Sequence, residues 1–403
     1  MLLIQKKLKY SLLIVILSVI AIPATMAFDD DEYDQLILGK SFFRIPWVAA
    51  PASTTARDGL GPLFNANTCK SCHHLHNGRG TGGRHRSAVV LVNIASNGLV
   101  PEPSYGSQIN ISAISGVVFE AKPIISYQHK TVTYPDGKQV ILKKPLVKLD
   151  QLNYGPLHPQ ANLSIRIAPA LIGLGLLEAI PEPDILANED IEDRNHDGIS
   201  GKANMQQGTL GRFTWKASVP SLKQQIANAA NNDMGLTNPL YPNENCTKNQ
   251  KACLNAPKGI GKFDLPMERL NAINFYLKNL KPAQLSVTET QGQQLFNQIG
   301  CNQCHKPSFT LESGKIIHPY SDLLLHDMGE GLNDNRRELL AEPSEWRTAP
   351  LWGIGNNFLH DGRASTIEEA ILWHGGEALP SKMLFMELPI HNREKLLKFV
   401  SEI

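Results

Sequence analysis

The chain lacks an excess of charge of either sign and, beyond its first residues, lacks a long apolar run. Its 403 residues include 39 Lys and Arg against 38 Asp and Glu, and no basic patch stands out. This balance argues against a nucleic-acid partner. Because no second apolar segment approaches the ~20 residues that span a bilayer, we expect no stable membrane span after signal removal.

The one apolar run lies at the N-terminus. Basic residues precede it, it extends from Leu12 to Ile22, and small residues follow before an acidic stretch. This order is typical of a secretory signal. The alternative is a membrane anchor, but the run is short for one and ends at Pro23. We therefore predict a signal peptide over residues 1–27, cleaved near Ala27, and a periplasmic protein.

Cysteine is also scarce, with six residues in the chain. Four of them lie in two copies of Cys-x-x-Cys-His, namely Cys69, Cys72 and His73, and Cys301, Cys304 and His305. In this motif the two thiols add to the vinyl groups of a haem and the His ligates its iron. The alternatives, a zinc half-site and a thioredoxin-like pair, do not require the adjacent His twice. The sequence therefore predicts two covalently bound c-type haems.

The two remaining cysteines are Cys246 and Cys253, which lie in a loop rich in Pro, Asn and Lys. In an oxidising compartment, a local disulfide is the simplest prediction, and free thiols are the alternative.

The surroundings of the two motifs indicate an internal duplication. Leu63-Phe64-Asn65 precedes Cys69 by the interval that separates Leu295-Phe296-Asn297 from Cys301. Further along, RIAPALIGLG resembles RTAPLWGIG, and FTWKASVPSLKQQI resembles FLHDGRASTIEEAI. We predict a mainly α fold of two cytochrome c-like haem domains, over residues 28–281 and 282–403.

The N-terminal domain is expected to carry an insertion and a long loop region. Residues 116–149 are rich in Val, Ile, Tyr and Thr around Tyr134-Pro135-Asp136-Gly137, which predicts a β-hairpin or small sheet.

Helices are expected on both sides of the domain boundary. Apolar periodicity predicts one from Met267 to Leu280, and a final amphipathic helix includes Leu396 and Val400. Between them, Ser286-x-x-Glu289 is a capping-box pattern that would open the helix leading to Cys301.

Several segments resemble the bacterial di-haem oxidoreductase family, whose members carry peroxidase or thiol oxidoreductase labels. They are GLGPLFNANTCKSCH, APALIGLGLLEAI, DGISGKAN, DLLLHDMG, EWRTAPLWGIG and FLHDGRASTIEEAILWHGGEA. That family is similar to di-haem cytochrome c peroxidases and to MauG-like enzymes. The resemblance implies that one haem relays electrons while the other binds peroxide.

The resemblance also implies axial ligands. In the relatives a Met or Tyr ligates the C-terminal haem fourteen positions after the His of a His-Asp-Gly turn, and here His360 plus fourteen is His374. His326 is the rival ligand, and a histidine bonded to a haem propionate is the other alternative for His374. For the N-terminal haem the candidates stay open, together with an unfilled site: His74, His76, His85, His129 and His158.

Peroxide cleavage requires a group that moves a proton between the two oxygens. The resemblance points to Asp233, in Asp233-Met234 after Leu222-x-x-Gln225. Glu178 is the alternative, because its apolar neighbours would raise its pKa. Trp215 corresponds to a Trp between the haems of the relatives and is a candidate electron relay, or else a packed aromatic residue.

Polar motifs suggest further roles. Arg166, Arg347 and Arg363 are expected to pair with carboxylates or haem propionates. Asp193-x-Asn195-x-Asp197-Gly198 resembles the start of a calcium loop, although Asn204 stands where a bidentate acid is usual. A turn-rich polar loop is the favoured interpretation, and calcium is the alternative.

The leading hypothesis is an exported di-haem oxidoreductase of peroxidase type, in which the C-terminal haem passes electrons to a reactive N-terminal haem. Its partners would be a small redox protein or another electron donor, and hydrogen peroxide or an unknown substrate. The alternative is a di-haem electron-transfer cytochrome without catalytic activity.

Overall fold

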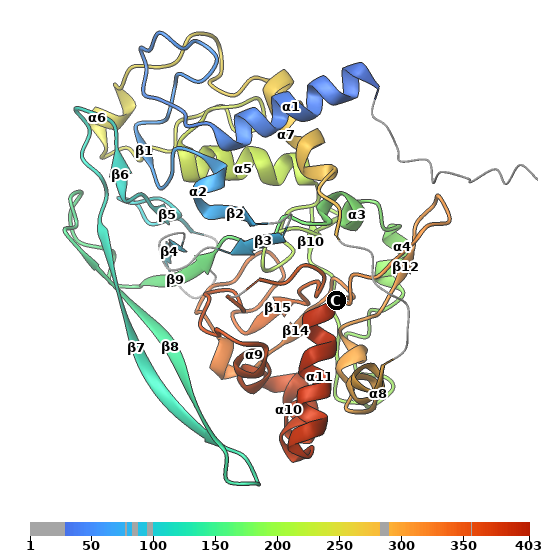
Figure 1. Ribbon diagram of the computed structural model, residues 1–403. Helices are drawn as coiled ribbons and strands as arrows, with labels where there is room; N and C mark the ends of the chain where they lie inside the picture. Colours follow the sequence, from blue (N-terminus) through green and yellow to red (C-terminus); the bar gives the residue numbers. More distant parts are fainter. Residues whose placement is uncertain (1–28, 77–78, 83–87, 95–99, 283–289, 356) are drawn as a thin grey trace, which may run out of the picture.

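The computed structural model describes residues 29–403 except 77–78, 83–87, 95–99, 283–289 and 356. The predicted signal peptide therefore lies outside the described residues. Among the described residues, no helix is both long and apolar enough to cross a membrane. Helices gather at two ends of the molecule, with α1, α5 and α7 at one end and α9, α10 and α11 at the other (Figure 1).

Each half of the chain contains a pair of helices that pack against each other. In the first half α1 (Asp30–Arg44) packs against α7 (Met267–Lys278), and in the second α8 (Gln291–Gln298) packs against α11 (Ile390–Glu402). The expected helices near residue 267 and at the C-terminus are thus confirmed. The expected capping pattern at Ser286 and Glu289 lies outside the described residues, and the described start of α8 is capped by Thr290, whose side chain accepts from the Gln293 amide.

At each of these helix crossings, a glycine allows the two backbones to lie close together. A Cβ atom on Gly39 would lie 1.9 Å from the Ala272 carbonyl oxygen, and one on Gly292 would lie 2.3 Å from that of Lys395. Only glycine lets the two backbones approach so closely. The two crossings are equivalent features of the two halves.

This equivalence corrects one part of the predicted repeat. Leu63 and Phe64 form the two-residue strand β1 (Leu63–Phe64), whereas Leu295 and Phe296 lie in helix α8. The helix of the first half that corresponds to α8 is α1, which ends at Arg44, so a longer connection separates helix from motif there. Equal spacing to the cysteines therefore did not mean equal structure.

The later part of the repeat is confirmed by the backbone. The Phe213 amide donates to the Val219 carbonyl, and the Phe358 amide donates to the Ala364 carbonyl, both at 2.9 Å. After each turn a capped helix begins: α5 (Leu222–Met234) behind Ser221 and α9 (Ile367–Trp373) behind Thr366. Each cap side chain accepts from the amide three residues on, as N-caps do. The two segments therefore share one fold, 145 positions apart in the sequence.

The insertion is a long antiparallel hairpin, as predicted, of β7 (Lys122–Thr133) and β8 (Gln139–Asp150). It runs along one side of the molecule toward the C-terminal helices (Figure 1). Near its tip, the Tyr134 hydroxyl donates to Glu368 at 2.8 Å and Lys138 pairs with Glu368 at 2.6 Å. The hairpin thus joins the two halves instead of decorating the first alone.

Small sheets account for most of the remaining regular structure. The three-stranded sheet has the order β5 (Gln108–Ile109), β4 (Ala88–Ile94), β9 (Ala161–Ile167), all antiparallel. Two-stranded sheets pair β1 with β6 (Ser112–Ala113), β2 (His73–His76) with β3 (Arg79–Gly82), β10 (Met205–Gln206) with β11 (Thr209–Leu210), β12 (Phe309–Thr310) with β13 (Ile316–Ile317), and β14 (Leu325–Asp327) with β15 (Glu345–Arg347). Short helices are α2 (Cys69–Cys72), α3 (Leu174–Glu178), α4 (Glu182–Leu186), α6 (Lys251–Leu254), α10 (Leu379–Glu387), η2 (Cys301–Gln303), η3 (Glu330–Leu332) and η4 (Gly376–Ala378). The expected mainly α fold is therefore confirmed only in part.

Two large apolar cores correspond to the two motifs. One, between Phe42 and Leu277, has Cys69 packed against it. The other has Cys301 packed against it and is built mainly from the second half, but it also includes Tyr134 and the buried residues between Leu177 and Leu210. First-half segments therefore complete the second core, and the division into two cytochrome c-like domains stays a prediction.

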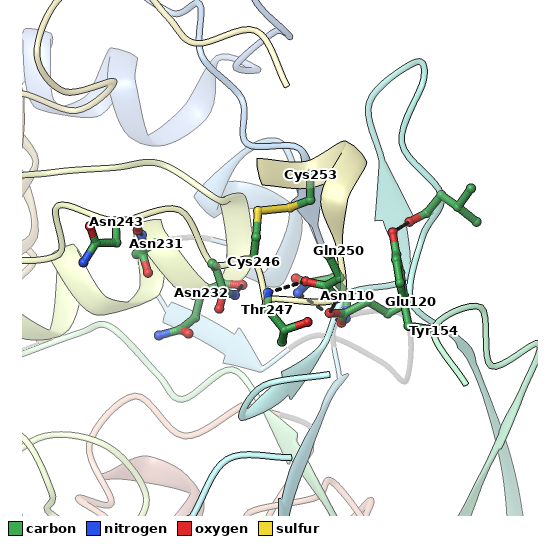
Figure 2. Close-up of a disulfide and its surroundings, with 12 residues drawn as sticks. Asn110, Glu120, Tyr154, Asn231, Asn232, Asn243, Cys246, Thr247, Gln250 and Cys253 are labelled. Atoms are coloured by element: carbon green, nitrogen blue, oxygen red, sulfur yellow. Dashed lines mark hydrogen bonds between the residues drawn. A yellow bond between two sulfur atoms is a disulfide. The ribbon is translucent and has the colours of Figure 1, made fainter. Parts of the chain in front are cut away.

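The predicted disulfide between Cys246 and Cys253 is present (Figure 2). Between them, the fully buried Gln250 accepts from the Thr247 amide at 2.6 Å and donates to Glu120 at 2.5 Å. The disulfide loop is thereby fixed to the segment that leads into β7.

Candidate functional site

Both Cys-x-x-Cys-His motifs line one cavity of about 770 Å³ in the interior. Its lining is mostly apolar and also contains Trp215, Asp233 and His374. The tertiary structure therefore brings together two motifs that lie more than two hundred residues apart.

Each motif forms a tight helical turn that presents its cysteines to the cavity. The first is α2, capped by Thr68, whose hydroxyl accepts from the Ser71 amide at 3.0 Å. The second is η2, entered through Gly300 at φ +85°, a conformation that favours glycine. Burial raises the pKa of the Cys69 and Cys301 thiols to about 12, with the Asp233 carboxylate adding to the effect at Cys69. These thiols are therefore held uncharged.

The motif histidines are each held by one ring nitrogen. Nδ1 of His73 lies 3.1 Å from the Pro169 carbonyl oxygen, and Nδ1 of His305 lies 2.8 Å from that of Tyr320. Since a carbonyl only accepts, each Nδ1 carries the proton. A histidine held this way presents Nε2 as a lone-pair donor, which is how metal-ligating histidines are oriented.

His374, the predicted second ligand of the C-terminal haem, has the same arrangement. Its Nδ1 donates to the Ala370 carbonyl at 2.7 Å, and it lines the cavity together with His305. Burial lowers the pKa of His374 to about 4, despite the opposing effect of the bond to Ala370. The neutral imidazole is the form that binds iron.

The rival, His326, has both ring nitrogens engaged. Nε2 lies 2.8 Å from Asp322 and Nδ1 lies 2.7 Å from Glu377. The two carboxylates raise its pKa well above the usual value against the effect of burial. An imidazolium that donates a hydrogen bond from each ring nitrogen has no lone pair to give to iron. The geometry therefore favours His374 over His326 as the ligand.

The duplicated turn shows what replaces His374 in the first half. Trp215 occupies the place of His360 in its turn, and fourteen positions after Trp215 is Ala229, which lines the cavity. A methyl side chain cannot bind iron. Of the open histidine candidates, His129 and His158 are exposed and do not line the cavity, His74 and His76 lie in β2, and His85 is outside the described residues.

Asp233 lies near the end of α5, facing the cavity beside the first motif. Gln108 donates to its Oδ1 at 2.7 Å and to the Asn232 carbonyl at 3.2 Å. Burial raises the pKa of Asp233 to about 6, and the bond from Gln108 opposes this. Such a carboxyl can gain and lose a proton near neutral pH. Gln108 carries no motif, and the sequence analysis missed it.

Glu178 has different surroundings from those expected. Its side chain pairs with Lys278 at 2.5 Å and accepts from the Leu222 amide at 2.8 Å. It does not line the cavity that contains the two motifs. The apolar environment suggested by its sequence neighbours is thus wrong, because α3 ends where it meets α5 and α7.

Trp215 lies where the two repeats meet. Its Nε1 donates to the Ile167 carbonyl at 2.8 Å, while the Ile167 amide donates to the carbonyl of His360, the residue equivalent to Trp215. The Arg347 amide in turn donates to the Trp215 carbonyl at 3.1 Å. Each half's turn is therefore bonded to a strand of the other half, with Trp215 at that junction.

Two of the three arginines pair with carboxylates, and the third bonds to backbone carbonyls. Arg166 pairs with Asp334 at 2.6 Å and Glu338 at 3.1 Å, and Arg363 pairs with Asp361 at 2.7 Å. Arg347 lines the cavity and donates to the carbonyls of Thr214 and Thr348. A haem propionate stays its predicted partner.

The calcium-like loop does not assemble an ion site from its acids. Both carboxylate oxygens of Asp193 accept from the Gly198 amide, and Asp197 accepts from the Ile199 amide. Within the described residues, no group of three or more His, Cys, Asp or Glu side chains could hold a metal ion. The loop has the bonding of a polar turn.

The donor set of the cavity fits two haems. Three histidines have Nδ1 fixed to backbone carbonyls, four thiols line an apolar chamber, and Arg347 is available for an acidic group. These residues could hold two iron porphyrins, with His305 and His374 serving one and His73 serving the other. A protein with such a site is a haem protein.

Comparison with known proteins identifies the family. The chain belongs to the family described as "Di-haem oxidoreductase, putative peroxidase", whose model matches residues 115–403. That span includes the motif at Cys301 and not the one at Cys69.

Other comparisons add little. A search of the curated proteins finds no match. A structure of Kuenenia stuttgartiensis hydrazine synthase under 20 bar xenon aligns with 34% of this chain and 55% of its own chain, at 20% identity and a TM-score of 0.23. A likeness at that level carries no argument.

Proposed function

We propose that this protein is an exported, periplasmic di-haem c-type oxidoreductase that reduces hydrogen peroxide or a related oxidant. One haem would be attached through Cys69 and Cys72, the other through Cys301 and Cys304. When bound, the haems supply electron transfer and an iron that can bind peroxide.

The observation that carries the proposal is the inequality of the two halves. His374, with Nδ1 bonded to Ala370, lines the cavity together with His305, whereas the equivalent position of the first half is Ala229. An iron with two histidine ligands changes oxidation state without opening, which suits a relay. An iron with one histidine can accept an external ligand, which suits a reactive site.

At the N-terminal site, the chain's own residues would manage protons. His73 is fixed by Pro169, and Asp233 is held by Gln108. Reduction of hydrogen peroxide to two waters consumes two electrons and two protons. We assign Asp233 the task of taking the proton from one peroxide oxygen and delivering it to the other. Glu178 is paired with Lys278 away from the cavity, so we do not assign it this role.

Between the sites, Trp215 is the candidate for electron relay. It lines the cavity, and its hydrogen bonds connect it to strand β9 and to Arg347 of the other half. The electrons would come from a small redox protein or another donor outside the cell membrane.

Electron paramagnetic resonance of the haem-loaded protein tests this proposal. We expect one low-spin signal that ignores peroxide and a second centre whose signal changes when peroxide is added to the oxidised or the partly reduced protein. Two low-spin signals that ignore peroxide in every redox state would refute the enzyme and favour the alternative, a di-haem electron carrier.

A further inference from the structure

The loop of residues 193–201, which resembled a calcium site, reaches from the first half to the second motif. Asp197 accepts a hydrogen bond from Gln303, which lies between Cys301 and Cys304, at 3.4 Å. Ile199 lines the cavity, and a Cβ atom on Gly201 would come within 3.3 Å of the His326 ring. The loop therefore packs directly onto the C-terminal haem site.

Ser200 of this loop makes two hydrogen bonds to Glu377. Ser200 donates to the Glu377 carboxylate through its amide at 3.1 Å and its hydroxyl at 3.0 Å. The same carboxylate accepts from the Asp327 amide at 3.0 Å and from His326 at 2.7 Å. Four donors from two segments, two of them from Ser200 in the first half of the chain, thus converge on one partly buried carboxylate. Bonds of this kind to a charged acceptor are the stronger ones in proteins.

Glu377 follows His374 by three positions, with only two glycines between them. A Cβ atom on Gly376 would lie 2.2 Å from the Asp327 carbonyl oxygen, and one on Gly375 would lie 3.0 Å from that of Met328. The segment therefore lies tightly against residues 327–329. Glycines supply no side chain to fix it, so Glu377 is the first residue after His374 that can do so.

We propose that Ser200 and Glu377 form a clamp between the two halves, which holds His374 in place as the distal ligand and so keeps the C-terminal haem closed to external ligands. This inference rests on the proposed function. Ser200 and Glu377 are positioning residues, since they act through the segment that carries His374. The loop of residues 193–201 thereby acquires a role that needs no bound cation.

Carbon monoxide binding to the fully reduced, haem-loaded protein tests the clamp, because carbon monoxide binds ferrous haem only where an axial position is free. We expect one carbon monoxide per chain in the parent protein and two in a His374→Gly variant. In Ser200→Ala and Glu377→Gln, the share of C-terminal haem that binds carbon monoxide should rise about tenfold, since one charge-assisted bond is worth about a factor of ten or more.

Matched controls separate the clamp from general damage. Glu387→Gln and Ser401→Ala change exposed helical residues and should leave carbon monoxide binding at one per chain. Ser200→Thr keeps the hydroxyl, so its C-terminal haem should stay closed to carbon monoxide. Ser200→Ala retains the bond from its backbone amide, so it should still fold and carry two haems.

Binding at one per chain in both clamp variants, with unchanged low-spin signals, overturns the clamp and leaves the proposed function intact. Binding of no carbon monoxide by the parent protein overturns the proposed open N-terminal site, and a rise in the share of C-terminal haem that binds it in the clamp variants would still support the clamp.

Discussion

Replacing Asp233 by Asn tests the proposed proton transfer and the electrostatics of the cavity together. The carboxyl group has a pKa of about 6 because of burial, against a usual value of 3.8. Each tenfold difference in proton affinity corresponds to about 1.4 kcal/mol, so the ionised group costs the folded state about 3 kcal/mol at pH 7. The variant removes this cost and keeps the shape of the side chain.

The sign of the stability effect follows from linkage. The folded protein binds the proton more tightly than the unfolded chain, so the contribution of Asp233 to the free energy of unfolding falls as pH rises from about 4 to about 6. Below pH 4 the variant and the parent should be equally stable. Near pH 7 the variant should be more stable, by up to about 3 kcal/mol, in denaturant unfolding of the haem-loaded protein.

The peroxide-reducing activity of the Asp233→Asn variant should fall near pH 7, where its stability rises. If Asp233 takes a proton from peroxide, the parent rate should rise with pH and level off above about 6. The variant should lose this inflection and about 10²-fold or more of kcat/KM at pH 7. Steady-state peroxide reduction between pH 5 and 8 measures both, with the exposed Asp184→Asn as control. A variant within a few-fold of the parent, with the inflection intact, would refute the assignment.

Three further changes test other parts of the site. His374→Gly should convert the C-terminal low-spin signal to that of a five-coordinate haem, whereas His326→Gln should keep bis-histidine coordination; the reverse result would show that we chose the wrong ligand. Trp215→Phe should slow electron transfer between the haems in flash-reduction kinetics while both haem spectra stay unchanged, and an unaltered rate would exclude Trp215 as the relay. Replacing Cys246 and Cys253 together by Ser should lower the free energy of unfolding by about 2 kcal/mol, as expected for a short closed loop; an unchanged stability would mean that the Gln250 bonds alone fix the loop.

Local sequence signals predicted the features whose parts are close along the chain. The hairpin turn at Tyr134, the disulfide between residues seven positions apart, and the helix expected from Met267 are all present. They were predictable because turn, cap and pairing preferences act over a few residues.

The same reasoning was wrong where a local pattern depends on distant partners. The apolar neighbours of Glu178 suggested an isolated carboxyl, but Lys278 lies about a hundred positions away in sequence and pairs with it. The loop of residues 193–201 gave no sign in its own sequence that Ser200 bonds to Glu377 of the second half. Charges that neutralise each other across the fold leave no trace in a short motif.

The sequence by itself determined the chemistry that is written in adjacent residues: two Cys-x-x-Cys-His motifs, and therefore two haems in the prediction. Only the tertiary structure decided which histidines have a nitrogen to offer. His326 and His374 look alike as candidates, yet one is held between two carboxylates and the other by a single carbonyl. A ligand is defined by the bonds its ring has not already made, and those bonds come from residues brought together by folding.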